Sequence, residues 1–218
     1  MKTRILPLLS CIAFSFLSCN GQEKKPPVKN STTIVKTAVG DLELPAPYAT
    51  ESARKISRMK EWPEGVTPKA PEGFVVTKFA DGLKNPRWTY IAPNNDIFVV
   101  ESNTFKSANQ ITIFRDKDGD GVFETREIFK DGLNMPFGML ILDNYFYIAN
   151  TDGLFRFPYS AGDLKLRGNG TKILELPAGG YNNHWTRNLL ANADGSKIYV
   201  SVGSASNNAE HGMEVEKR

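Results

Sequence analysis

Short apolar runs of about five residues follow one another along the second half of the chain. In the run from Lys197 to Val202, residues Ile198, Val200 and Val202 alternate along the chain and therefore face one side of a strand. Asp, Gly and Asn residues, which favour turns, separate the runs. No long stretch has the period of an amphipathic helix. The expected strands are 97–100, 111–115, 126–129, 145–149, 153–157, 172–176, 186–191 and 197–202.

These runs belong to a repeat with a spacing of about 50 residues. Asp81-Gly82-Leu83 opens the first copy and Asp131-Gly132-Leu133 opens the second, and each is followed by a proline, a short run, a turn and a strand. The third copy lacks this opening and begins at His184. Such a period is typical of a propeller blade. The sequence therefore predicts an all-β propeller over residues 71–218. About three blades fit in this range, and because a closed propeller needs at least four, we expect an N-terminal portion of a longer protein.

The start of the chain has the pattern of an export signal. Lys2 and Arg4 precede an apolar run that is too short to cross a bilayer and ends at Leu-Ser-Cys19. This ending resembles a bacterial lipobox, so residues 1–19 are expected to be a lipoprotein signal peptide, with Cys19 carrying the lipid. An ordinary secretory signal is the alternative. Either reading predicts an exported protein, and the lipobox predicts attachment to the cell envelope by the lipid alone.

Two further segments precede the repeat. Residues 20–33 are polar and rich in Pro and Lys, which predicts a flexible tether. Residues 34–70 are mixed and interrupted by prolines, which predicts an irregular lead-in. The net charge is only +3, and no basic run is interleaved with aromatic residues. Nucleic acid is therefore not expected as a partner.

One loop carries several acidic residues. Asp116, Asp118, Asp120 and Glu127 match the spacing of an EF-hand, but the flanking runs are strand-like and a true EF-hand needs helices. The loop is expected to be a hairpin tip whose carboxylates hold a structural Ca²⁺. The alternative is a solvated acidic turn, because Asp and Gly favour turns for backbone reasons alone.

The best candidate for chemistry is His184, in the segment Asn-Asn-His-Trp-Thr-Arg-Asn just before a strand. A residue at a strand end can be presented to a cleft. An imidazole is a working base near neutral pH. The alternative is a packed loop residue that bonds to the backbone. The other histidine, His211, is expected at the surface.

Three stretches resemble the glucose/sorbosone dehydrogenase family. They are Pro71–Arg87, Asp96–Ser102, and His184–Leu189 taken together with Tyr199–Asn207. The resemblance covers about residues 70–218. It implies a six-bladed propeller that uses pyrroloquinoline quinone (PQQ) to oxidise a sugar. The histidine at 184 would take the proton of the sugar hydroxyl while hydride passes to the quinone. Glucose-specific members carry an acid that orients this histidine, and Ser204 stands at that position here, as in the sorbosone-like branch. The resemblance therefore implies that Ser204 orients the ring through a neutral hydrogen bond.

The same resemblance implies a set of cofactor contacts. PQQ is a tricarboxylate and needs cationic donors. Arg87 and Arg187 occupy matching positions at the starts of blade strands and are expected to hold its carboxylates. Asn188 and Asn207 are weaker candidates for polar contacts. The arginines could instead be solvated or paired with blade carboxylates. The family's catalytic Ca²⁺ ligands are expected after Arg218.

The leading hypothesis is therefore an exported quinoprotein that oxidises an aldose or a sorbosone-like sugar, with an unidentified electron acceptor. One rival is a gluconolactonase-like propeller hydrolase with a catalytic divalent metal on the central axis. Glu101 is the candidate metal ligand for it in the early part of the chain. The other rival is a non-catalytic propeller that binds glycans or another protein.

Overall fold

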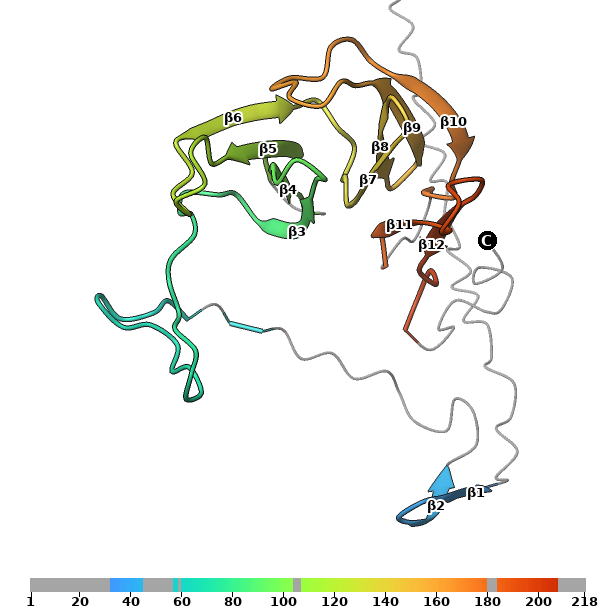
Figure 1. The fold of residues 1–218 in the computed structure, drawn as a ribbon. Coiled ribbons are helices and arrows are strands. Elements are labelled where there is room, and N and C mark those ends of the chain that lie inside the picture. Colours follow the sequence, from blue (N-terminus) through green and yellow to red (C-terminus); the bar gives the residue numbers. More distant parts are fainter. Residues whose placement is uncertain (1–31, 45–56, 59, 104–106, 180–183, 208–218) are drawn as a thin grey trace, which may run out of the picture. The chain divides into compact units, whose positions relative to one another are not determined.

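In the computed structural model of this chain, the described residues are 32–44, 57–58, 60–103, 107–179 and 184–207 (Figure 1). The chain divides into two units, Met1–Glu51 and Ser52–Arg218. The predicted signal peptide with Cys19, nearly all of the predicted tether, and His211 lie outside the described residues. Within the described residues, no helix is long and apolar enough to cross a membrane.

The described part of the first unit is one hairpin. Strands β1 (Thr33–Thr37) and β2 (Gly40–Leu44) pair antiparallel, and all of their residues are exposed. The lead-in that was expected to be irregular from residue 34 therefore contains a regular element. Thr, Ile and Val at the start of β1 favour extended backbone. The turn is closed by the hydroxyl of Thr37, which donates to the carbonyl oxygen of Gly40 at 2.6 Å.

The second unit contains two antiparallel sheets of four strands each. In both sheets, strands that are consecutive in sequence pair with one another, so each sheet is a simple meander. The first sheet consists of β3 (Pro86–Ile91), β4 (Ile97–Glu101), β5 (Gln110–Arg115) and β6 (Thr125–Lys130). The second consists of β7 (Gly138–Leu142), β8 (Tyr145–Asn150), β9 (Gly153–Pro158) and β10 (Thr171–Glu175).

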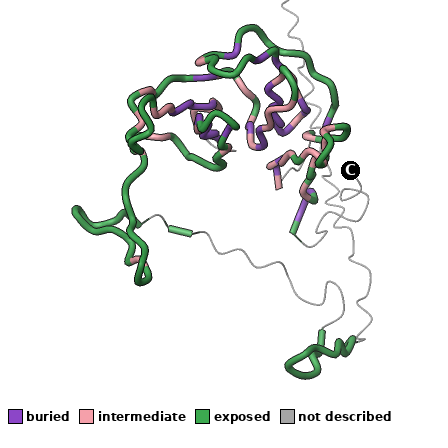
Figure 2. The backbone as a smooth tube through the Cα atoms, viewed as in Figure 1, coloured by how far each residue is buried: buried purple, intermediate pink, exposed green. Residues whose placement is uncertain are grey.

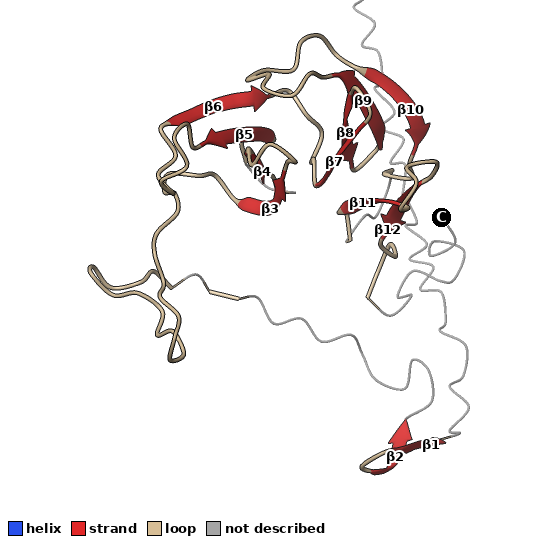
Figure 3. Cartoon of the chain, viewed as in Figure 1, coloured by secondary structure: helices blue, strands red, loops and turns tan. Residues whose placement is uncertain are grey.

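A third sheet contains β11 (Arg187–Ala191) and β12 (Ile198–Val202), paired antiparallel. The described residues thus hold two four-stranded blades and the first two strands of another, and the secondary structure among them consists of strands and loops (Figure 3). The all-β propeller prediction is confirmed. The expected strand list gave no bounds for β3 and β7, the first strands of the two complete blades, which the sequence showed only as the short run of each repeat.

The hydrophobic core lies between the two complete blades. Phe98, Phe129 and Phe146 are at most 1% exposed, and their ring centroids lie 4.6 to 5.0 Å apart in tilted or edge-on pairs. Figure 2 shows stretches of buried backbone in both of these blades. Burying one such ring contributes about 2–3 kcal/mol. The rings come from β4, β6 and β8, so the packing holds the two blades against each other.

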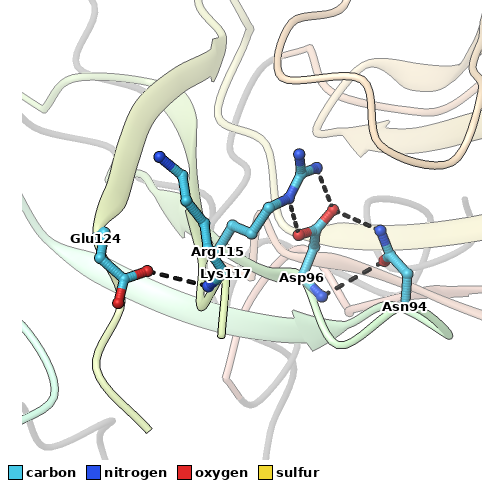
Figure 4. A network of polar contacts seen from close by, with 5 residues as sticks. All are labelled: Asn94, Asp96, Arg115, Lys117 and Glu124. Carbon is cyan, nitrogen blue, oxygen red and sulfur yellow. Dashed lines mark hydrogen bonds and ion pairs between the residues drawn. The ribbon is translucent and has the colours of Figure 1, made fainter. Parts of the chain in front are cut away.

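A buried ion pair fixes one end of the first blade. Both oxygens of Asp96, which is 1% exposed, accept from the Arg115 guanidinium at 2.6 and 2.7 Å (Figure 4). The amide of Asn94 donates to the same carboxylate at 2.8 Å. The bond to Asp96 raises the pKa of Arg115. The pair ties the start of β4 to the end of β5.

The first strands of successive blades lie next to one another, because β7 contacts both β3 and β11. The contact with β11 is closest at Gly138. A Cβ at that position would lie 2.8 Å from the carbonyl oxygen of Arg187 and 2.9 Å from the Cα of Asn188. Only glycine allows the two backbones to approach so closely. The starts of β3, β7 and β11 are therefore the part of the unit that positions His184.

Candidate functional site

His184 lies three residues before β11 and is half-buried. Its Nδ1 is 3.0 Å from the carbonyl oxygen of Ser204 and 3.2 Å from the Ser204 hydroxyl. The hydroxyl itself donates to the carbonyl oxygen of Ser206 at 2.8 Å. The loop that follows β12 therefore holds the imidazole through a residue twenty positions away in sequence.

These partners determine which ring nitrogen carries the proton. A carbonyl oxygen only accepts, so Nδ1 must be the donor and carry the hydrogen. The other nitrogen, Nε2, then has the lone pair of the neutral ring. The ring is thus held by neutral oxygens of Ser204, as expected where a serine replaces an acid. The arrangement leaves Nε2 as the nitrogen that can accept a proton.

Gly203 makes this contact possible. A Cβ at residue 203 would lie 2.6 Å from the Cβ of His184 and 2.9 Å from its carbonyl oxygen. Both atoms are close to the backbone and cannot rotate away. Glycine is therefore required for the loop after β12 to reach the histidine. Nothing in the sequence pattern pointed to Gly203, because the contact depends on how β11 and β12 pair.

Arg87 is exposed at the start of β3 and lies close to the histidine loop. Its guanidinium carbon is 5.6 Å from the ring centroid of Trp185, the residue after His184. Such a cation–π contact holds a guanidinium over an aromatic face and leaves its N–H edge free to bind an anion. The structure therefore places one of the two predicted arginines over the ring of Trp185, the residue that follows the candidate base.

An irregularity in β3 explains the direction of Arg87. The pairing register with β4 shifts between Pro86 and Trp88, so Arg87 is the extra residue of a bulge. A bulge re-aims side chains that would otherwise alternate.

Trp88 packs on Phe137 with ring centroids 5.5 Å apart, and Phe137 meets Trp185 edge-on at 6.2 Å. Trp88, Phe137 and Trp185 thus form a row of rings across three blades, which the sequence interpretation did not identify.

Arg187 occupies a different environment. Its side chain is 0% exposed, and its guanidinium donates to the backbone carbonyl oxygens of Pro177, His184 and Thr186 at 2.7, 2.9 and 3.1 Å. The expected role as a direct contact for cofactor carboxylates does not agree with this placement, because the side chain has no accessible surface. The sequence could not distinguish the two arginines, since both begin a blade strand.

The two predicted asparagines differ in exposure. Asn188 is half-buried in β11, and its side-chain oxygen accepts from the backbone N–H of Leu189 at 2.9 Å. Asn207 is exposed after β12, on the same loop as Ser204. Neither position excludes contact with a ligand, and their expected role stays a prediction.

Four acidic residues of the loop form a carboxylate group, meaning a cluster of carboxylates, and one of the four differs from the prediction. Oxygens of Asp116, Asp118, Asp120 and Glu124 lie within 4.8 Å of one another. The predicted fourth ligand, Glu127, is not in the group, because β6 begins at Thr125 and carries residue 127 along the strand. Glu124 instead accepts from the backbone N–H of Lys117 at 3.0 Å (Figure 4).

Asp116 is the best-organised member of this group. It accepts from the backbone N–H groups of Gly119 at 2.7 Å and Gly121 at 2.8 Å. These bonds, that of Gly121 above all, lower the pKa of Asp116 from its ordinary value. The loop is a hairpin tip between β5 and β6, as expected, and its carboxylates have the chemistry that a hard cation needs.

Glu101, the candidate metal ligand of the hydrolase hypothesis, is buried at 2% exposure. One carboxylate oxygen accepts from Thr112 at 2.6 Å and Gln110 at 2.9 Å, and the other accepts from the backbone N–H of Lys84. All of these partners are within the first blade. The carboxylate is thus occupied in joining β4, β5 and the segment before β3, which disfavours metal binding there.

Two cavities lie away from the histidine. One of about 380 Å³ is lined by Glu127, Asp163, Leu164, Lys165 and Arg167. The other, of about 340 Å³, is lined by Pro93, Asn94, Ile141, Asp143, Tyr159 and Ala161. Neither includes His184, so the candidate site is defined by the contacts of the imidazole and by Arg87.

The fold and this site describe a propeller with a histidine held at the start of a blade. A protein-family model described as TrAA12-like matches residues 68–217. The chain therefore belongs to the TrAA12-like family, which is consistent with its resemblance to glucose/sorbosone dehydrogenases. A search of curated proteins found no match.

Solved structures with similar folds include the holo form of the pyranose dehydrogenase PQQ domain from Coprinopsis cinerea, with 13% identity and a TM-score of 0.48. The match covers 59% of this chain and 30% of that one. The iodide and calcium structures of a Trichoderma reesei family AA12 carbohydrate-active enzyme are each 16% identical, with TM-scores of 0.47 and 0.46. Each match covers 59% of this chain and 32% of the solved chain. The chain thus spans about a third of the length of these structures.

Proposed function

We propose that this chain is part of a PQQ-dependent sugar dehydrogenase in which His184 is the general base. The observation that carries the proposal is the imidazole bound through Nδ1 to Ser204, in a member of the TrAA12-like family. A base needs a lone pair on a positioned nitrogen, and Nε2 has one. The substrate is a sugar with an oxidisable hydroxyl or aldehyde.

The residues around His184 suit a planar anionic cofactor. Arg87 offers an exposed guanidinium held over Trp185, and a guanidinium pairs with carboxylates through two parallel bonds. Arg87 would hold one carboxylate of PQQ, and Asn188 and Asn207 would add polar contacts. The aromatic ring of Trp88, which is 41% exposed, adds a flat surface nearby. When bound, the quinone would accept the hydride of the sugar carbon and with it the two electrons of the oxidation.

In the proposed reaction, the protein residues hold the base in position and move a proton. Nε2 of His184 would accept the proton of the sugar hydroxyl, and the ring would become an imidazolium. Ser204 would stabilise this cation through its carbonyl and hydroxyl oxygens, because Nδ1 remains a donor in both protonation states. Neutral acceptors stabilise the imidazolium less than a carboxylate would.

The proposal also covers a metal site, the location of the protein and its partners. The carboxylates of Asp116, Asp118, Asp120 and Glu124 would bind a structural Ca²⁺, without a part in the reaction. The protein would be exported and attached to the bacterial cell envelope by a lipid on Cys19. Sugar is the small-molecule partner, and a separate acceptor would reoxidise the cofactor.

The test uses the full-length protein, supplied with PQQ and Ca²⁺. It should reduce a redox dye when aldoses are added. His184→Ala should abolish dye reduction, whereas PQQ should still bind, as measured by quenching of tryptophan fluorescence. Lactone hydrolysis without any PQQ-dependent dye reduction would support the hydrolase instead. Binding of sugar without turnover would support a binding propeller.

A further inference from the structure

A buried arginine is bonded to the backbone of the histidine loop. Arg187 is always charged and is 0% exposed, so its placement in the interior requires compensating partners. Its Nη1 donates to the carbonyl oxygens of His184 at 2.9 Å and Thr186 at 3.1 Å. Its Nη2 donates to the carbonyl oxygen of Pro177 at 2.7 Å. The guanidinium therefore bonds to main-chain oxygens on both sides of one connection.

This connection joins the second blade to the next. Pro177 follows β10 by two residues, and His184 and Thr186 lie just before β11. One planar group with several donors in a fixed geometry bonds to both ends of the loop at once. An ammonium group is a single point with no such span, so lysine cannot make the same set of bonds.

The bond to His184 adds to two restraints already described. The carbonyl oxygen of His184 accepts from Arg187, its Nδ1 donates to Ser204, and its Cβ packs against Gly203. Together these contacts hold the backbone, the Cβ and the ring of one residue. Without the bond from Arg187 to its carbonyl oxygen, the backbone of His184 could move while the ring stayed attached at Ser204. The Nδ1 bond to Ser204 would then lengthen or break.

We propose that Arg187 is a positioning residue for His184, setting the direction of Nε2 through the backbone of the loop. It is not a contact for the cofactor. This inference rests on the proposed function of His184 as a base. Its structural part, the coupling of Arg187 to the imidazole, is measurable without the reaction.

The first test is NMR of the protein labelled uniformly with ¹⁵N, with the His184 ring signals assigned by comparison with His184→Gln. The wild-type ring should show a protonated Nδ1 and an unprotonated Nε2. Arg187→Lys and Arg187→Met should populate both tautomers and broaden the ring signals, and amide signals of β4 and β5 in the first blade should stay in place. Arg156→Met is the matched control, because Arg156 packs over Tyr145 in the second blade, 4.8 Å from its ring centroid.

The second test uses the full-length enzyme loaded with PQQ. Both Arg187 variants should lower kcat about 100-fold or more, and the Kd for PQQ should change less than about threefold. A large loss of PQQ affinity with unchanged kcat would overturn the proposal and make Arg187 a cofactor contact. Unchanged His184 ring signals in both variants would also overturn the proposal. Loss of all blade signals would overturn it too, because Arg187 would then be needed for folding as a whole.

The two tests separate this inference from the proposed function. If His184→Ala keeps full dye reduction, His184 is not the base and the proposed mechanism fails. The NMR result then still decides whether Arg187 orients the imidazole. If His184→Ala is inactive but the Arg187 variants keep wild-type kcat and ring signals, only the positioning role fails.

Discussion

A Cβ added to Gly203 would lie 2.6 Å from the Cβ of His184, which is far inside normal van der Waals contact. Gly203→Ala should therefore displace the loop after β12 or the imidazole and break the Nδ1 bond to Ser204. We expect dye reduction by the PQQ-loaded enzyme to fall at least about tenfold. The matched control is Gly179→Ala, because a Cβ there meets nothing within 4 Å. Equal activity of both variants would contradict the close contact.

The buried ion pair of the first blade should contribute far more than an exposed one. Asp96→Ala leaves the Arg115 guanidinium, whose side chain is only 24% exposed, without its partner. We expect the free energy of unfolding to fall by about 3 kcal/mol. Asp81→Ala is the control, since the Lys78–Asp81 pair is more than 70% exposed on both sides and should have no measurable effect. Urea denaturation of both variants measures the difference.

The acidic loop allows a test that separates two neighbouring glutamates. Glu124 belongs to the carboxylate group, and Glu127 does not. Glu124→Gln should weaken Ca²⁺ binding at least about tenfold, because it removes one charged ligand. Glu127→Gln should leave the affinity unchanged. Isothermal titration with Ca²⁺ measures both. A larger loss for Glu127→Gln would restore the fourth ligand predicted from sequence, and no binding by the wild type would make the loop a solvated turn.

Tyr159 should make stability depend on alkaline pH. Burial, and then the nearby Asp96 carboxylate, raise the pKa of its phenol above the ordinary value of 10.0. The folded state thus holds the proton more tightly than the unfolded state. This contribution to stability is fully present below the unfolded pKa and is lost as the pH rises through the folded pKa.

The measurement is the free energy of unfolding as a function of pH, from about pH 9 upward. The wild type should lose stability in this window, and Tyr159→Phe should lose less, because phenylalanine has no proton to release. Tyr199→Phe serves as the control, since Tyr199 is 54% exposed. Identical slopes for the wild type and Tyr159→Phe would refute the expectation.

The blade architecture could be predicted from local pattern because short runs rich in apolar residues, bounded by Asp, Gly or Asn turns, recur along the chain. The bounds of the first strands were left open for a physical reason. β7 lies between two neighbouring first strands, so its residues do not alternate between core and solvent. The bulge at Arg87 similarly depends on the pairing of β3 with β4, which no local pattern reveals.

The sequence by itself determined the kind of fold, its repeat and the acidic turn, and it supplied His184 as the candidate base, because these depend on residue type and spacing along the chain. Only the tertiary structure decided what surrounds each candidate. It buried Arg187 and exposed Arg87, put Glu124 in place of Glu127 in the carboxylate group, and brought Gly203 against His184. The reason is that burial and hydrogen-bond partners are set by strand pairing and blade packing between residues distant in sequence.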